Sequence, residues 1–253
     1  MKRTRVVLVL GAALAVSPAA QAYRPFNGTD AAVADEGQME IELGPAGYVR
    51  EGSDDFLVAP SAIFNWGFAE RWEIVLEGRQ FVRLGSDGPE PRVSLQDDAL
   101  SLKTVLREGA LQEKSGISLA LELSVLLPEV NGDSGAGAEA TVIASHRTEA
   151  VTVHLNGAVT WTRGHDGGWF AGVIAEVHDA WTVRPVAEVF ADGEGSLPVT
   201  VSGLAGAIWR VSENLSFDAA FRLARAGGVD TTELRAGLTW AFAVGFPSVR
   251  RKP

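Results

Sequence analysis

Apolar and polar side chains alternate along most of this chain, and no other feature of the sequence restricts its fold as strongly. In the segment 117–125, Ile, Leu or Val occupies every second position, with Ser, Ala, Glu and Ser between them. The segments 72–77 and 151–161 show the same period. A period of two is typical of β-strands that have one apolar and one polar face, so we expect an all-β chain.

The alternating segments number about twelve, and none has the period of an amphipathic helix. The connections at 84–97 and 128–137 are longer than those at 67–71 and 211–213. Short turns at one end with longer loops at the other are typical of an outer-membrane barrel whose termini are both periplasmic. The expected strands lie near 38–47, 56–66, 72–83, 98–108, 116–127, 138–147, 150–162, 168–178, 180–191, 198–210, 214–225 and 231–243.

Alternation alone fits two architectures. In a soluble β-sandwich the apolar faces meet in a shared core, whereas in a membrane barrel they face lipid and the polar faces line the lumen. Tryptophan favours the barrel, because all seven Trp residues fall on the apolar face and near strand ends. Membrane-interface girdles place Trp there. The expected girdle consists of Trp66, Trp72, Trp161, Trp169, Trp181, Trp209 and Trp240.

Charged residues share the opposite parity, which places them inside a barrel. A basic side chain on the lipid face would cost about 2–4 kcal/mol at the membrane midplane. His154 and Asn156 also face the expected lumen, where contact with a solute and simple packing explain them equally well. We predict that the lumen is lined by Glu73, Glu77, Arg79, Lys103, Arg107, Glu122, His154, Asn156, Glu176, Arg184, Glu188, Arg222 and Arg235.

The first 22 residues have a basic start, an apolar stretch and an Ala-x-Ala site, which predicts a secretory signal peptide at 1–22. Residues 23–253 then form a single domain. The formal charge of the 253-residue chain is −10, and without basic blocks such a chain is not expected to bind nucleic acid. No run after residue 22 is long enough for a membrane helix. The chain has no cysteine, so it has no disulfide framework.

The expected barrel begins with Arg24-Pro25, Thr29-Asp30 and Gly37 and continues through the stretches "APSAIFNWGFAERWEIVLEG", "TVHLNGAVTW" and "ELRAGLTWAF". In these motifs the sequence resembles a bacterial outer-membrane family named for the meta-pathway of phenol degradation, with Ala31 where a second Asp is common in that family. It covers nearly all of residues 24–243. It implies an outer-membrane β-barrel that passes or binds small, often aromatic, compounds.

The run "GDSG" at 132–135 matches the nucleophile motif of trypsin-like proteases. In those enzymes and in subtilisin the catalytic His precedes the Ser, whereas all four histidines here follow Ser134. The histidines also lack metal-ligand spacing. We therefore expect no catalytic residue, cofactor or metal site, and a loop around Ser134.

These observations predict a closed antiparallel transmembrane β-barrel in the outer membrane of a Gram-negative bacterium, reached by signal-peptide-directed export. Its expected function is that of a passive, porin-like channel or transporter for small compounds, aromatic or hydrophobic ones among them. Expected partners are outer-membrane lipids and, during assembly, the barrel-insertion machinery and periplasmic chaperones. Two alternatives stay open at this point: a non-conducting structural or binding barrel of the outer membrane, and a secreted β-sandwich.

Overall fold

The computed structural model describes residues 24–85, 91–177 and 180–244, and in these ranges the chain forms twelve antiparallel β-strands. The expected signal peptide at 1–22 lies outside the described residues. The strands are β1 (Gln38–Glu51), β2 (Asp54–Ala69), β3 (Trp72–Leu84), β4 (Val93–Arg107), β5 (Ser118–Leu126), β6 (Gly137–Arg147), β7 (Val151–Trp161), β8 (Gly167–Val177), β9 (Val183–Glu194), β10 (Thr200–Arg210), β11 (Leu215–Ala226) and β12 (Val229–Ala243).

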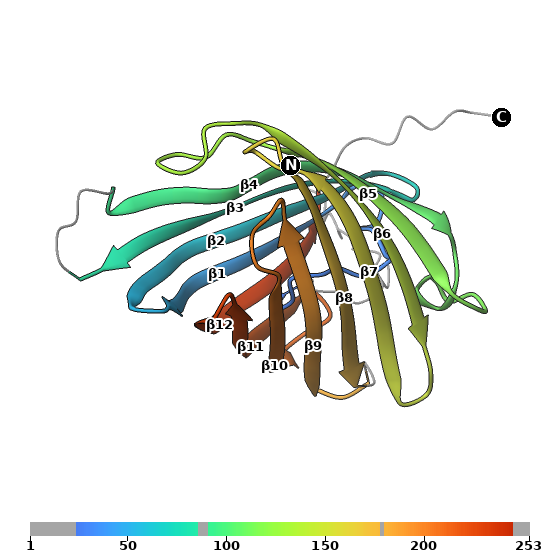
Figure 1. The fold of residues 1–253 in the computed structure, drawn as a ribbon. Coiled ribbons are helices and arrows are strands. Elements are labelled where there is room, and N and C mark those ends of the chain that lie inside the picture. Colours follow the sequence, from blue (N-terminus) through green and yellow to red (C-terminus); the bar gives the residue numbers. More distant parts are fainter. Residues whose placement is uncertain (1–23, 86–90, 178–179, 245–253) are drawn as a thin grey trace, which may run out of the picture.

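The strands form one closed ring, as Figure 1 shows, and each pairs with its neighbours in the sequence. Pairing between β1 and β12 closes the ring, from Gln38 opposite Ala243 to Glu51 opposite Thr231. Closure leaves no free sheet edge with unpaired backbone groups. The predicted fold class is confirmed. Below, the proximal mouth is the barrel end where β1 begins and β12 ends, and the distal mouth is the other end.

The two mouths do not divide into short turns and long loops as predicted. The distal mouth has long connections but also a two-residue turn at Gly227–Gly228, where both residues have positive φ (55° and 89°). Such a turn suits glycine and matches the twist of paired strands. At the proximal mouth, the connection at 108–117 is long because it contains the 3₁₀ turn η1 (Ala110–Gln112). Loop length therefore does not identify the mouths.

The outer surface of the ring is apolar and the inner surface is largely polar. Leu155 in the middle of β7 is 51% exposed, and Val189 on β9 is 62% exposed. Glu42 and Lys103 point inward and are 0% exposed. A soluble sandwich would bury its apolar face, so this distribution rules out the sandwich alternative. None of the described residues belongs to a helix that is long and apolar enough to cross a membrane.

The tryptophans lie on the outer surface near strand ends. Six of the seven are 39–57% exposed, and Trp66 is half-buried against Phe68, with 5.9 Å between the ring centroids. Trp161 and Trp169 lie near the distal mouth, and the other five lie near the proximal mouth. Trp181 precedes β9 instead of lying on it. The tryptophan rings thus form two rows, one near each mouth. Their contact with lipid head groups stays a prediction.

Substituting an outward-facing residue tests the lipid-facing surface. We expect Leu155→Arg to lower the stability of the folded barrel by about 2–4 kcal/mol, because the guanidinium would enter the hydrocarbon layer. Denaturant titration in lipid vesicles, read as heat-modifiable migration on gels, measures the change. The control is Glu149→Arg, in the exposed connection before β7. Equal stability of the two variants would contradict a lipid-facing position for Leu155.

Candidate functional site: the lumen and its N-terminal segment

Residues 24–37, called the N-terminal segment here, lie inside the barrel, where Figure 1 shows them in blue. Their backbone donates to side chains of the wall. Arg24 N donates to Glu42 Oε2 on β1 at 2.9 Å. Asn27 N and Gly28 N donate to the two carboxylate oxygens of Glu188 on β9, at 2.8 and 2.7 Å. A segment outside the sheet has no ladder partners, so these wall carboxylates satisfy its donors.

From its start beside β1 and β12, the segment then crosses the lumen to β7 and β6 and runs toward the proximal mouth. Thr29 N donates to Asn156 Oδ1 on β7 at 3.0 Å, and Asn156 Nδ2 donates back to Thr29 O at 2.8 Å. Ala31 N donates to Ser145 Oγ on β6 at 2.9 Å, and Ala34 N donates to Glu73 Oε2 on β3 at 2.6 Å. The segment thus contacts the wall around most of its circumference.

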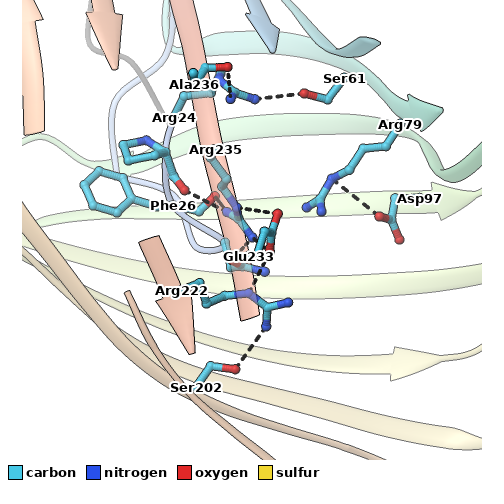
Figure 2. Close-up of polar contacts among 12 residues, drawn as sticks. Arg24, Phe26, Ser61, Arg79, Asp97, Ser202, Arg222, Glu233, Arg235 and Ala236 are labelled. Atoms are coloured by element: carbon cyan, nitrogen blue, oxygen red, sulfur yellow. Dashed lines mark hydrogen bonds and ion pairs between the residues drawn. The ribbon is translucent and has the colours of Figure 1, made fainter. Parts of the chain in front are cut away.

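Side chains of the segment add ionic contacts. Arg24 lies 3.4 Å from Asp218 on β11. It also donates to Ser61 Oγ at 2.9 Å and to Ala236 O at 3.2 Å (Figure 2). Asp30 lies 3.6 Å from Nζ of Lys103, which also donates to Thr29 Oγ1 at 3.1 Å. Lys103 is fully buried, and a buried ammonium needs such partners.

An arginine of the wall also holds the start of the segment, and a second arginine shares its carboxylate partner. Arg235 on β12 donates to Pro25 O at 2.7 Å and pairs with Glu233 at 2.7 Å. Arg222 on β11 pairs with the other oxygen of Glu233, also at 2.7 Å. Figure 2 shows the two guanidinium groups converging on this carboxylate. Glu233 therefore fixes the arginine that binds the segment.

Two cavities lie along the lumen, one on each side of the segment. The distal cavity has a volume of about 450 Å³ and is lined by residues 24–29 together with wall residues of the distal half. The proximal cavity has a volume of about 610 Å³ and is lined by Asp30, residues 32–36 and wall residues near the proximal mouth. The segment therefore lines both cavities, with its first part at the distal one and its second part at the proximal one.

The turn η1 narrows the proximal mouth further. Its Leu111 packs with Ala31, Ala120 and Ile143 in a small apolar cluster, and Gln112 Nε2 donates to Ala31 O at 2.9 Å. Burial beside this mouth raises the pKa of the Asp35 carboxyl above its usual range. The proximal cavity is therefore bounded by both the N-terminal segment and η1.

The side chains predicted to line the lumen face the interior, with one exception. Arg107 on β4 is exposed and stands opposite Leu119, because a bulge between Val105 and Arg107 turns its side chain to the outer face. Its predicted lumen position is wrong. The others line the distal cavity (Glu77, Arg79, Glu122, Asn156, Arg235), line the proximal cavity (Glu73, Arg184), contact the segment (Lys103, Glu188) or lie in the wall between (His154, Glu176, Arg222).

The sequence analysis did not place the N-terminal segment inside the lumen, although the contacts between this segment and the barrel wall organise the lumen. The sequence shows only that residues 24–37 do not form a strand, because they are polar and turn-forming and lack the period of two. Their partners lie far away in the sequence, such as Asp218 for Arg24. Periodicity reports only neighbours along the chain, so it could not reveal these pairs.

Ser145, His154 and Glu176 form a hydrogen-bonded row across β6, β7 and β8. Ser145 Oγ lies 2.8 Å from His154 Nδ1, and His154 Nε2 lies 3.1 Å from Glu176 Oε1. The residue types are those of a nucleophile, a base and an acid. However, Ser145 and His154 are buried, Ser145 Oγ also accepts the N–H of Ala31, and none of the three lines either cavity. The row joins strands and holds the segment.

No protein-family model and no curated protein matches this sequence. Solved structures do match its fold. An outer membrane channel from Pseudomonas putida F1 has a TM-score of 0.63 at 9% identity, over 83% of this chain and 97% of that one. The NanC porin has a TM-score of 0.59 at 7% identity, over 80% and 98% of the two chains. The KdgM porin, solved in complex with disordered oligogalacturonate, has a TM-score of 0.52 at 14% identity, over 80% and 99%. These neighbours are outer-membrane channel barrels.

Glu188, whose carboxylate accepts from the amides of Asn27 and Gly28, provides a test of the segment's position. We expect Glu188→Ala to speed hydrogen exchange at the amides of Asn27 and Gly28 at least about tenfold, because one hydrogen bond to a charged group contributes about 1.5–3 kcal/mol. Mass spectrometry of the detergent-solubilised barrel measures the exchange. The control is Glu139→Ala, whose carboxylate instead accepts from Thr141 and Thr160. Unchanged exchange at residues 27 and 28 would contradict their contact with β9.

Proposed function

We propose that this chain gives small compounds a passive route across the outer membrane, with the N-terminal segment as the narrowing of that route. The observation that carries the proposal is the polar lumen with cavities of about 450 and 610 Å³ on either side of the segment. Volumes in this range suit small molecules. Charge pattern and bore then decide which solutes pass.

Outer-membrane localisation is part of this proposal. The apolar outer surface with Trp near both mouths supports it, as does the fold shared with outer-membrane channels. The segment at 1–22 would direct export, both termini would be periplasmic, and assembly would use the insertion machinery and periplasmic chaperones. Passage needs no catalytic residue and no cofactor in this scheme.

The proposed solutes include aromatic or hydrophobic compounds. Phe26, Phe170 and Phe190 line the distal cavity, and the centroids of the last two rings lie 5.3 Å apart. Aromatic side chains offer a large apolar surface to such solutes. The motifs at the start of the N-terminal segment, which resemble the phenol meta-pathway family, agree with this class.

A second candidate function is a non-conducting barrel that serves as a structural or binding protein of the envelope. The observation that favours it is the segment itself, which contacts β1, β3, β6, β7, β9, β11 and β12 across the lumen. In this alternative the segment fills the lumen permanently.

Flux measurements separate the two functions. We expect liposomes containing the barrel to swell in arabinose or benzyl alcohol, and to swell several-fold faster when residues 24–36 are deleted, because the deletion joins the two cavities. The control is a chain with Glu149→Gln, outside the lumen. An absence of flux both in the full chain and in the deletion variant, each shown to be folded by heat-modifiable migration, would contradict the channel and favour the structural barrel.

A further inference from the structure

Three carboxylates line one side of the distal cavity. They are Glu77 on β3, Glu122 on β5 and Glu139 on β6. Glu139 accepts hydrogen bonds from the hydroxyls of Thr141 and Thr160. Within the described ranges no Lys or Arg lies at ion-pair distance from any of the three. Lys103 on β4 stands opposite Glu122, but its ammonium is bound by Asp30 and Thr29. Neighbouring carboxylates repel one another, and a bound cation relieves that repulsion.

The arginines that line the same cavity already have acidic partners. Arg24 pairs with Asp218 at 3.4 Å, and Arg79 on β3 pairs with Asp97 at 3.4 Å. Arg235 is held by Glu233 at 2.7 Å. Each of these arginines is therefore engaged by another carboxylate, including Arg79, which follows Glu77 by two positions on β3, and this part of the cavity stays acidic.

A separate observation, at Asn65 on β2, also indicates a missing donor. Asn65 lines the distal cavity and is 1% exposed. Its Nδ2 donates to Glu42 Oε1 at 2.9 Å, which fixes the orientation of the amide. Its Oδ1 then has no donor among the described residues. Leaving a buried acceptor unpaired is destabilising, and a ligand bearing N–H groups would supply the missing donor.

Another part of the cavity is lined by aromatic side chains. Phe26, Phe170 and Phe190 line it, together with smaller aliphatic side chains. The cavity volume of about 450 Å³ accommodates a small organic molecule. A ligand that matches both parts has a positive N–H donor at one end and an apolar body at the other.

We propose that the distal cavity is a binding site for a protonated organic amine with an apolar or aromatic body. Its ammonium lies among Glu77, Glu122 and Glu139, and its body lies against Phe170 and Phe190. This inference rests on the proposed function, since it names the solute class for which the route is selective. The three carboxylates repel an anion of the same size, and a neutral analogue gains no charge interaction with them. The site therefore binds the protonated amine in preference to both.

Binding of three matched probes tests the inference. The full barrel in detergent micelles is titrated calorimetrically at pH 7 with benzylamine, benzyl alcohol and benzoate, which share one ring and differ in charge. We expect benzylamine to bind at least tenfold more tightly than either of the others. A variant with Glu77→Gln, Glu122→Gln and Glu139→Gln is expected to lose at least tenfold in benzylamine affinity and to keep its affinity for benzyl alcohol.

The matched control replaces three exposed carboxylates outside the lumen, Glu51→Gln, Glu149→Gln and Glu213→Gln, and is expected to bind benzylamine as the unmodified chain does. Heat-modifiable migration shows whether the triple lumen variant is folded. If it is not, the single variant Glu77→Gln is used instead, and we expect a several-fold loss of benzylamine affinity. Equal affinity for the three probes, or benzylamine affinity unchanged by the lumen substitutions, would overturn the amine site.

Liposome flux distinguishes this failure from failure of the proposed function. Flux of benzyl alcohol and benzylamine at equal rates, with no selective binding, would overturn the amine site and leave the channel standing. Selective benzylamine binding without flux in the full chain or in the chain lacking residues 24–36 would support the site and contradict the channel.

Discussion

The arrangement of the lumen depends on hydrogen bonds between carboxylates of the barrel wall and backbone N–H groups of residues 24–34. Glu42, Glu73 and Glu188 each accept from the segment, at 2.6–2.9 Å. A chain inside the barrel has no sheet partner for its amides, and carboxylates shielded from water are costly unless they are bonded. Each group therefore stabilises the other, and the result is a lumen divided into two cavities.

The same alternation that makes the strands amphipathic produces both surfaces of this arrangement. Along β7, Leu155 and Val159 face outward, whereas His154 and Asn156 face the interior. Closure of the sheet turns one set to the outer surface and the other toward the N-terminal segment. In a soluble sandwich built from the same strands, the charged faces would point to solvent and would not enclose a polar lumen.

The strands, their order and the direction of most side chains were predictable, because a period of two is visible within a single segment. Arg107 was placed on the wrong face because one bulge after Val105 shifts the parity of the residues that follow, and a bulge of this kind leaves no mark in the alternation. The connections predicted to be long, at 84–97 and 128–137, do lie at the distal mouth, but alternation could not show that the proximal connection at 108–117 contains η1, which contacts the N-terminal segment. The N-terminal segment was missed because its contacts, such as Arg24 with Asp218, join residues far apart in the sequence.

The central claim is that the N-terminal segment crosses the lumen beside β7. The chain has no cysteine of its own, so a pair introduced as Gly28→Cys and Asn156→Cys reports on this contact alone. A Cβ at Gly28 would lie 3.0 Å from Cγ of Asn156, within the reach of a disulfide. The account predicts that mild oxidation links the two cysteines in the folded barrel, while the pair Gly28→Cys and Glu149→Cys stays unlinked. A folded barrel in which residues 28 and 156 fail to link would contradict it.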